Sequence, residues 1–293
     1  MLMKLLLAAA LAAAPTPAVP AAGLPDADPA LWVVRDDDTT IYLFGTFHAL
    51  DGKTDWFNDE VRTAFDRSGE LVLEALIPDD PAAMQPVVMK YALDRSGKTL
   101  TSKLSPEAQK ALAAELGKIG APANALDGFR PFFATMTLTM AQMQKLGVTA
   151  DKGTEAVLRK AAKDAGKPVS ELENVEFQIA MFDRISEADQ LHMLEQLLES
   201  LDTLPSETQR MLSAWNKGDA AGFKAIMDQS DEQGPAAYKV IFSDRNATWA
   251  EWVDRRLDKP GTVFVAVGTG HLSGKDSVQQ ILVQRGIQAQ RMN

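Results

Sequence analysis

Short apolar runs rich in β-branched and aromatic residues lie near both ends of the chain. Residues 31–34 and 41–44 are two such runs separated by a polar stretch, a pattern typical of a β-hairpin. Residues 70–75 form a third predicted strand, whose apolar centre indicates burial on both faces. Residues 262–267 and 287–291 add two more strands late in the sequence. The pattern therefore predicts one sheet with strands drawn from both chain ends.

The long middle of the chain, from about residue 81 to about residue 258, has apolar residues at helical spacing. Ser105 followed by Pro106 is a typical helix start. The predicted helices in this block include residues 129–146, 154–165, 191–201, 207–217, 219–228 and 243–257. Helices at 56–67 and 277–284 are expected beside the strands. We therefore expect an α/β fold over residues 23–293: a mixed central sheet built from both chain ends, with a large helical insertion at about 81–258.

Residues 1–22 have the order of a secretory signal peptide. One positive charge, Lys4, precedes an apolar run at 5–14, and prolines and small residues follow it. The run is shorter than the roughly 20 residues needed to span a bilayer, and later apolar stretches are interrupted by charges. We expect cleavage of this segment and a periplasmic or secreted protein without a stable membrane span. An uncleaved anchor is the alternative.

Composition narrows the classes of partner. The chain has no cysteine, so an exported protein of this sequence must be stabilised by core packing rather than by disulfides. Its net charge of −10 opposes binding to a phosphate backbone, and no basic stripe compensates. We therefore expect no nucleic-acid partner; the charge names no substrate, and the peptide or small-molecule substrate that we expect rests on the candidate site described below.

Two of the three histidines occupy matching segments. His48 ends Gly45-Thr46-Phe47-His48 and His271 ends Gly268-Thr269-Gly270-His271, and each segment follows a predicted strand. Ligand sites of α/β folds gather at the carboxyl ends of the strands, where glycine lets the backbone turn sharply. We therefore expect both imidazoles at one edge of the sheet. His192, in a helical context, is interpreted as an ordinary helix residue.

Glu74 is the third candidate, because it follows three apolar residues at the end of a strand. A carboxylate there is costly to bury without a partner. Two histidines and one carboxylate form an ordinary ligand set for Zn²⁺, Mn²⁺ or Fe²⁺. Simple packing of His48 and His271, with Glu74 as a cap, explains the spacing equally well.

The sequence resembles the TraB/GumN family, which is similar to the TIKI-type metal-dependent proteases. The matching segments are Leu43 to His48, Leu71 to Glu74, Gly166 to Val169 with Leu172, Glu173 and Gln178, Gly218-Asp219, Asp244 to Asn246 with Trp249, and Val267 to Leu272. The resemblance covers about residues 31–291. It implies an α/β core related to erythromycin-esterase-like and ChaN-like proteins, and it adds Arg245 to His48, Glu74 and His271 as the candidate site.

Together with the predicted signal peptide, the resemblance implies an exported hydrolase that cleaves a peptide or other acyl bond. His48, His271 and Glu74 would hold a divalent metal (Mn, Zn or Co) that activates water, and Arg245 would stabilise developing negative charge. Glu74 could instead act as a general base. The alternatives are a metal-free reaction with histidine as the base, a periplasmic haem, metal or small-ligand binding protein without turnover, and an accessory protein with a vestigial site.

Other polar residues have plainer interpretations. Arg130 opens a helix, and Asp151 lies in a loop before another. Glu173 and Gln178 border a helix start and are expected to be capping or packing groups.

Overall fold

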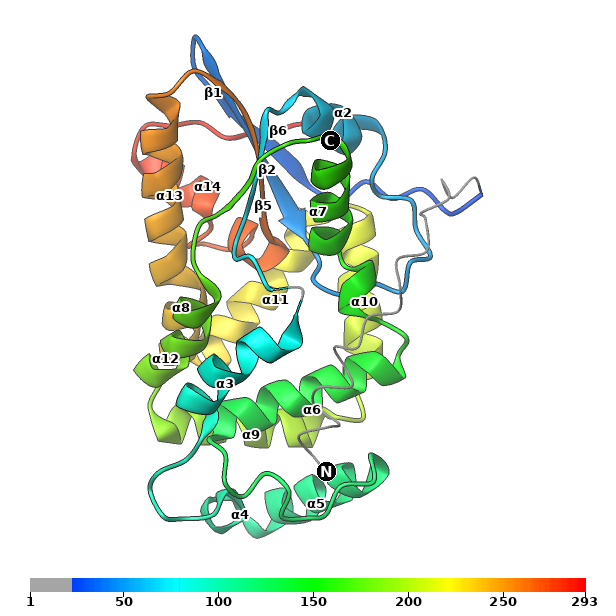
Figure 1. Ribbon diagram of the computed structural model, residues 1–293, viewed down its shortest axis with the longest axis vertical. Helices are drawn as coiled ribbons and strands as arrows, with labels where there is room; N and C mark the ends of the chain where they lie inside the picture. The colour runs from blue at the N-terminus through cyan, green and yellow to red at the C-terminus, as the bar shows by residue number, and fades with distance from the viewer. Residues whose placement is uncertain (1–22, 79) are drawn as a thin grey trace. The chain divides into compact units, whose positions relative to one another are not determined.

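A computed structural model describes residues 23–78 and 80–293 (Figure 1). The predicted signal peptide lies outside the described residues. The chain divides into two compact units, one made of residues 23–76, 146–174 and 206–293, the other including residues 77–145 and 175–205. The first contains the sheet and is called the sheet unit, and the second is called the helical unit.

The sheet unit contains a six-stranded sheet. Its strands are β1 (Leu31–Arg35), β2 (Thr39–Thr46), β3 (Glu70–Leu73), β4 (Val169–Glu171), β5 (Gly261–Gly268) and β6 (Gln290–Arg291). They lie in the order β4-β3-β5-β2-β1-β6. Strand β5 pairs in parallel with β2 and β3, and β3 pairs in parallel with β4, whereas β1 is antiparallel to β2 and β6. The predicted hairpin and the mixed sheet drawn from both chain ends are confirmed.

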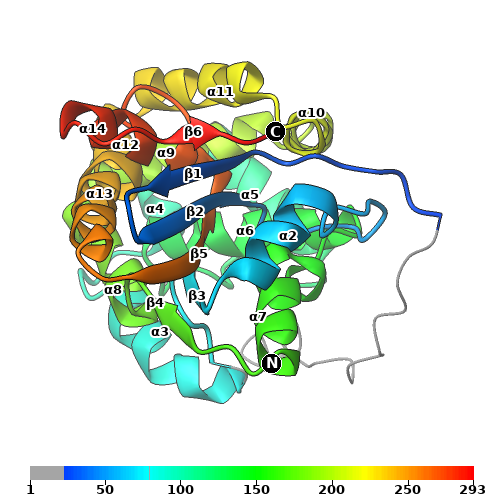
Figure 2. The ribbon, with the colours of Figure 1, turned by 90° about the horizontal axis from the view of Figure 1, so that it is seen from above.

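Helices cover both faces of the sheet. The helices and helical turns of the sheet unit are α2 (Asp59–Arg67), η2 (Ala150–Lys152), α7 (Thr154–Asp164), α10 (Leu204–Asn216), α11 (Ala220–Gln233), α12 (Pro235–Tyr238), the π-helical turn η4 (Lys239–Ser243), α13 (Asp244–Leu257), η5 (Thr269–Leu272) and α14 (Val278–Gln284). In Figure 2, α2 and α7 lie on one side of the strands, and α13 and α14 lie on the other.

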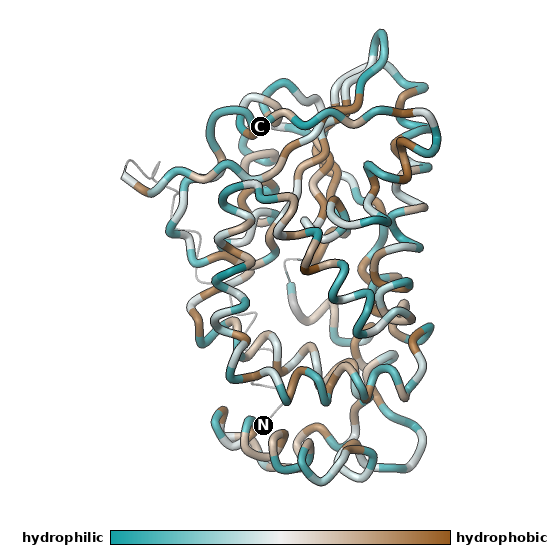
Figure 3. Tube along the Cα trace, turned by 180° about the vertical axis from the view of Figure 1, so that it is seen from behind, coloured by the Kyte–Doolittle hydropathy of each residue, from teal (hydrophilic) through white to brown (hydrophobic). Residues whose placement is uncertain are grey.

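Alternation along β5 assigns its side chains to the two faces. Phe264 and Ala266 pack with α2 and α7, while Val263, Val265 and Val267 pack with α13 and α14. All five side chains are buried. Figure 3, which is coloured by hydropathy, shows hydrophobic residues (brown) gathered in the region of the sheet. Burying one such side chain contributes about 1.5–3 kcal/mol, so the central strand is held firmly from both sides.

The helical unit has a separate apolar core. Its elements are η1 (Pro81–Met84), α3 (Gln85–Ala92), α4 (Leu100–Lys103), α5 (Pro106–Lys118), α6 (Pro131–Lys145), α8 (Val175–Ala180), η3 (Met181–Arg184) and α9 (Glu187–Ser200). Leu112, Leu138 and Leu194 bring α5, α6 and α9 together. Ser105 caps α5 as predicted, since its hydroxyl accepts from the Ala108 amide. No helix of the described residues is long and apolar enough to cross a membrane.

One strand was not predicted. β4 lies within the stretch expected to be helical and pairs Leu71 with Val169 and Leu73 with Glu171. It consists of three residues and is not fully buried, so it has neither the length nor the apolar pattern that marks the other strands. Its pairing with β3 adds an edge strand to the sheet, next to the strand that Glu74 follows.

Candidate functional site

The candidate residues follow three neighbouring parallel strands. In the register of β2 with β5, Thr46 lies opposite Gly268, and in that of β3 with β5, Leu73 lies opposite Ala266. The chain therefore leaves all three strands at one edge of the sheet. His48, Glu74 and His271 come within three residues of these strand ends, so the predicted placement at a shared edge is confirmed.

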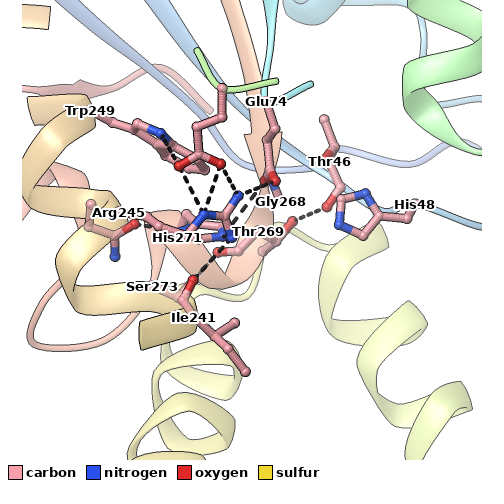
Figure 4. A network of polar contacts seen from close by, with 12 residues as sticks. Thr46, His48, Glu74, Ile241, Arg245, Trp249, Gly268, Thr269, His271 and Ser273 are labelled. Carbon is pink, nitrogen blue, oxygen red and sulfur yellow. Dashed lines mark hydrogen bonds and ion pairs between the residues drawn. The ribbon is translucent and has the colours of Figure 1, made fainter. Parts of the chain in front are cut away.

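Gly268 lies at the point where the three side chains converge (Figure 4). A Cβ atom on this residue would lie 3.1 Å from Glu74 Oε1, 3.4 Å from His48 Nε2 and 3.6 Å from His271 Cδ2. The Gly268 amide also donates a hydrogen bond of 2.6 Å to Glu74 Oε1. A residue with a side chain would therefore fit here only if the Glu74 carboxylate moved by a few tenths of an ångström.

His271 is buried and its tautomer is fixed. The Asn246 amide group donates to the carbonyl of Asp276, which turns its Oδ1 toward His271 Nδ1 at 2.6 Å. An amide oxygen only accepts, so Nδ1 carries the proton and Nε2 presents its lone pair. Arg245 Nη1 donates to that Nε2 at 3.0 Å, and the Trp249 ring lies 4.4 Å from the imidazole ring, centroid to centroid. Burial lowers the pKa of His271 to about 3, so the ring is neutral at physiological pH.

Arg245 organises two buried carboxylates. Its Nε contacts both oxygens of Glu173 at 3.0 Å, and its Nη2 contacts Glu74 Oε2 and Glu173 Oε2 at 2.9 Å. Its Nη1 donates to the carbonyl of Ile241 and to His271. Every N–H of the guanidinium therefore has an acceptor. In this arrangement Arg245 holds Glu74 and His271 in place, while its predicted contact with developing substrate charge stays a prediction.

Glu74 is ionised despite its burial. Desolvation opposes the charged form, but His271, His48 and Arg245 around the carboxylate lower its pKa to about 2. Because His271 is neutral, the groups that favour the anion at physiological pH are protonated His48, the Arg245 guanidinium and the Gly268 amide. Glu74 therefore presents a charged oxygen, Oε1, beside Gly268.

His48 is held from outside the predicted motif. Its Nδ1 lies 2.6 Å from Glu155 Oε1, and a carboxylate oxygen accepts, so Nδ1 carries a proton here as well. The charge of Glu155 and its hydrogen bond raise the pKa of His48 above its ordinary value. The His48 side chain is 70% exposed and that of Glu155 is 23% exposed. His48 is thus the solvent-facing member of the site, whereas His271 is its buried member.

Three residues of this network were not assigned to the site by sequence reasoning. Glu173 pairs with Arg245 and also accepts from Trp249 Nε1 at 3.0 Å, so the interpretation as a simple cap was too weak. Asn246 was part of the resemblance, but its contact with His271 was not expected. Glu155 had only the signature of an acidic residue in the first turn of a helix. His192 is exposed on α9, as expected of an ordinary helix residue.

The residues fit a divalent cation in the kind of atoms they offer. Both imidazoles have a protonated Nδ1 bound to an acceptor and Nε2 turned toward the region of Glu74, the arrangement that typically orients metal-ligating histidines. Two features oppose a closed three-ligand centre. Arg245 contacts His271 Nε2, and among the described residues only Asp26, Asp28 and Asp59 bring three candidate ligand atoms within 4.8 Å of one another.

Fold and site together define a class: an α/β protein with paired Gly-x-x-His turns and a buried carboxylate at the carboxyl edge of its sheet. The chain matches the TraB/PrgY/gumN family over residues 30–291 and belongs to this family.

Relatives of the chain are described only as uncharacterized proteins. YbaP of Escherichia coli (strain K12) is 34% identical over 147 residues, which cover 50% of this chain and 54% of YbaP, and YbaP of Shigella flexneri gives the same values. The chain thus spans about half the length of these relatives. An uncharacterized protein of Treponema pallidum (strain Nichols) is 23% identical over 273 residues, or 87% of this chain and 80% of the relative. No solved structure is significantly similar to the chain.

Proposed function

We propose that the chain is an exported, metal-dependent hydrolase that cleaves a peptide or other acyl bond. The observation that carries the proposal is the convergence on Gly268 of His48 Nε2, the Glu74 carboxylate and the His271 ring. Packing alone gives no reason for two imidazoles and a carboxylate to meet at one glycine. The net charge of −10 fits a peptide or small-molecule substrate better than a nucleic acid.

His48, His271 and Glu74 are the residues that would hold the ion, with Mn²⁺, Zn²⁺ or Co²⁺ as candidates. When bound, such an ion would activate water and polarise the scissile carbonyl. Glu155 and Asn246 keep the protons of the two rings on Nδ1, so the Nε2 lone pairs are available once His48 is deprotonated. Arg245 keeps Glu74 charged.

A second candidate is a hydrolase without a metal. The contact of Arg245 Nη1 with His271 Nε2 favours it, because that lone pair already has a partner. His48 would then act as the general base once it is deprotonated, oriented by the Glu155 carboxylate that raises its pKa. The buried network of Glu74, Arg245 and His271 would then be a fixed polar surface next to His48.

Protein purified without a His tag separates the candidates. Calorimetric titration with Mn²⁺, Zn²⁺ or Co²⁺ should give about one or two bound ions, and His48→Ala or His271→Ala should weaken binding sharply, because each removes a ligand. His192→Ala is the matched control and should bind as the wild type does. A screen of peptides and esters, with and without chelator, tests hydrolysis in parallel.

Each outcome decides between the candidates. Hydrolysis that stops with chelator and returns with added metal supports the metal-dependent reaction. Hydrolysis in excess chelator by protein that binds no ion supports the His48 base and overturns the metal. Tight binding of a metal, haem or other small ligand with no turnover across the screen overturns both in favour of a binding protein.

A further inference from the structure

The geometry points to Glu155 as a positioning residue that fixes the proton of His48 on Nδ1 and thereby aims Nε2 at Glu74 and Gly268. The role of the oriented His48 ring in a reaction rests on the proposed function, whereas its orientation by Glu155 does not. Glu155 acts through His48 and would not itself touch substrate.

The contact between the two side chains sets the tautomer. His48 Nδ1 and Glu155 Oε1 are 2.6 Å apart, a short distance typical of a charge-assisted hydrogen bond. In water, the neutral imidazole of histidine favours a proton on Nε2. A carboxylate on Nδ1 reverses that preference, so the neutral ring offers its lone pair on Nε2. On that side, a Cβ on Gly268 would lie 3.4 Å from Nε2.

The backbone around Glu155 is joined to the His48 turn. The Thr154 amide donates to the Phe47 carbonyl at 3.2 Å, and the Phe47 amide donates to Thr154 Oγ1 at 3.1 Å. Thr154 is fully buried. These two bonds fix the start of α7 against the segment that carries His48, so the reach of Glu155 is determined by the fold.

Gly153 brings the two segments closer than any other residue would permit. A Cβ there would lie 2.0 Å from the His48 carbonyl oxygen and 2.7 Å from its carbonyl carbon. Three consecutive residues therefore act together. Gly153 allows the close approach of the two segments, Thr154 holds them by hydrogen bonds, and Glu155 orients the His48 ring.

A first-turn acidic residue is also favourable for the helix dipole, which is the plainer explanation for Glu155. The dipole does not require a histidine 2.6 Å from the carboxylate, nor a side chain that is only 23% exposed. Glu60 offers the comparison, because it is an exposed acidic residue in the first turn of α2. A dipole role predicts equal effects of removing either carboxylate.

The test is the protonation pattern of the His48 ring by ¹⁵N NMR of histidine-labelled protein. The chain has three histidines, so His48→Ala assigns the signal. In wild type and in Glu60→Ala, Nδ1 should stay protonated in mildly acidic and in alkaline buffer. In Glu155→Ala, the neutral ring should shift to the Nε2–H form, and Glu155→Gln should partly restore Nδ1–H through its amide oxygen. Circular dichroism verifies that each variant is folded.

Titration with Mn²⁺ or Zn²⁺ adds a second readout. Glu155→Ala should weaken binding by about 10–100-fold, the usual effect of losing a residue that orients a ligand, while Glu60→Ala should not. An unchanged His48 tautomer in folded Glu155→Ala overturns the inference, whatever the metal does. A tautomer shift in a protein that binds no metal supports the positioning role and refutes only the metal part of the proposed function.

Discussion

Replacing Arg245 with methionine tests whether the buried ion network organises the site. Methionine keeps an unbranched chain but removes the guanidinium, leaving Glu74 and Glu173 with side-chain exposures of 11% and 6% without their shared cation. Removing one partner of a buried ion pair costs about 3–5 kcal/mol, because a charge is left buried and uncompensated. A typical domain has a free energy of unfolding of about 5–15 kcal/mol, so the variant should fold but unfold at lower urea concentration.

The loss of unfolding free energy in Arg245→Met should change with pH in a definite direction. In the wild type the pKa of Glu74 is lowered to about 2 from an ordinary 4.5. Without Arg245, burial should raise it above the ordinary value, so the folded variant takes up a proton more readily than its unfolded chain. The difference in unfolding free energy between wild type and variant should therefore shrink as pH falls toward about 5.

Arg285→Met is the matched control for Arg245→Met. Arg285 Nη2 lies 2.6 Å from Asp254 Oδ2, but both side chains are 39% exposed. An exposed pair of this kind contributes about 0–1 kcal/mol. Urea unfolding followed by circular dichroism should separate the two variants clearly. Equal losses, or a difference from wild type that grows at low pH, would refute the view of Arg245 as the obligatory counter-ion.

A double-mutant cycle sharpens the same experiment. Arg245→Met leaves Glu173 without its counter-charge, whereas Glu173→Gln leaves Arg245 with Glu74 as its remaining carboxylate. Combining them should destabilise the protein by less than the sum of the single losses, because residues in one network are coupled. Simple additivity would show that the two side chains contribute independently.

Three further predictions concern the site and the N-terminus. Burial lowers the pKa of His271 from 6.5 to about 3, so on acidification the unfolded chain binds a proton before the folded protein does. The free energy of unfolding should therefore fall as the pH drops from 6.5 toward 3. If the difference in unfolding free energy between wild type and His271→Gln does not change with pH, this expectation is contradicted. Gly268→Ala should weaken binding of Mn²⁺ or Zn²⁺ at least tenfold, because its Cβ would lie 3.1 Å from Glu74 Oε1. Gly128→Ala is the control and should bind as the wild type does, because nothing lies within 4 Å of its Cβ. Equal titration curves for the two variants would count against the convergence of the site on Gly268. N-terminal sequencing of exported protein should begin between residues 15 and 26, and an intact Met1 would rule out cleavage.

The parts of the fold that were predictable are those with long apolar patterns. The strands β2 and β5 are buried over most of their length, and their sequences are correspondingly rich in apolar and β-branched residues. Because both precede a Gly-x-x-His segment, the common edge for His48 and His271 followed from chain direction alone. β6 has two residues, shorter than the strand predicted at 287–291, because only Gln290 and Arg291 pair with β1.

The carboxylates that hold His48 and Arg245 were not predictable, for a physical reason. Glu155 and Glu173 are far from the motifs in sequence, and an acidic side chain at a helix start has an ordinary local explanation. Only the packing of α7 and α13 around the sheet brings Glu155 to His48 and Arg245 to Glu173. The π-helical turn η4 likewise has no clear sequence signal, yet its Ile241 carbonyl accepts from Arg245.

Two of the five tryptophans flank the two histidine segments, which gives the protein a built-in optical probe. Trp215 Nε1 donates to the Gly45 carbonyl at 2.8 Å, and the ring lies 6.1 Å from that of Phe47, beside His48. Trp249 packs against His271 on the other side. Ligand binding that moves either turn would therefore change the emission of an indole in direct contact with it. Replacing Trp32, Trp56 and Trp252 with phenylalanine would leave fluorescence that reports on these two places, so ligands could be screened before any substrate is known.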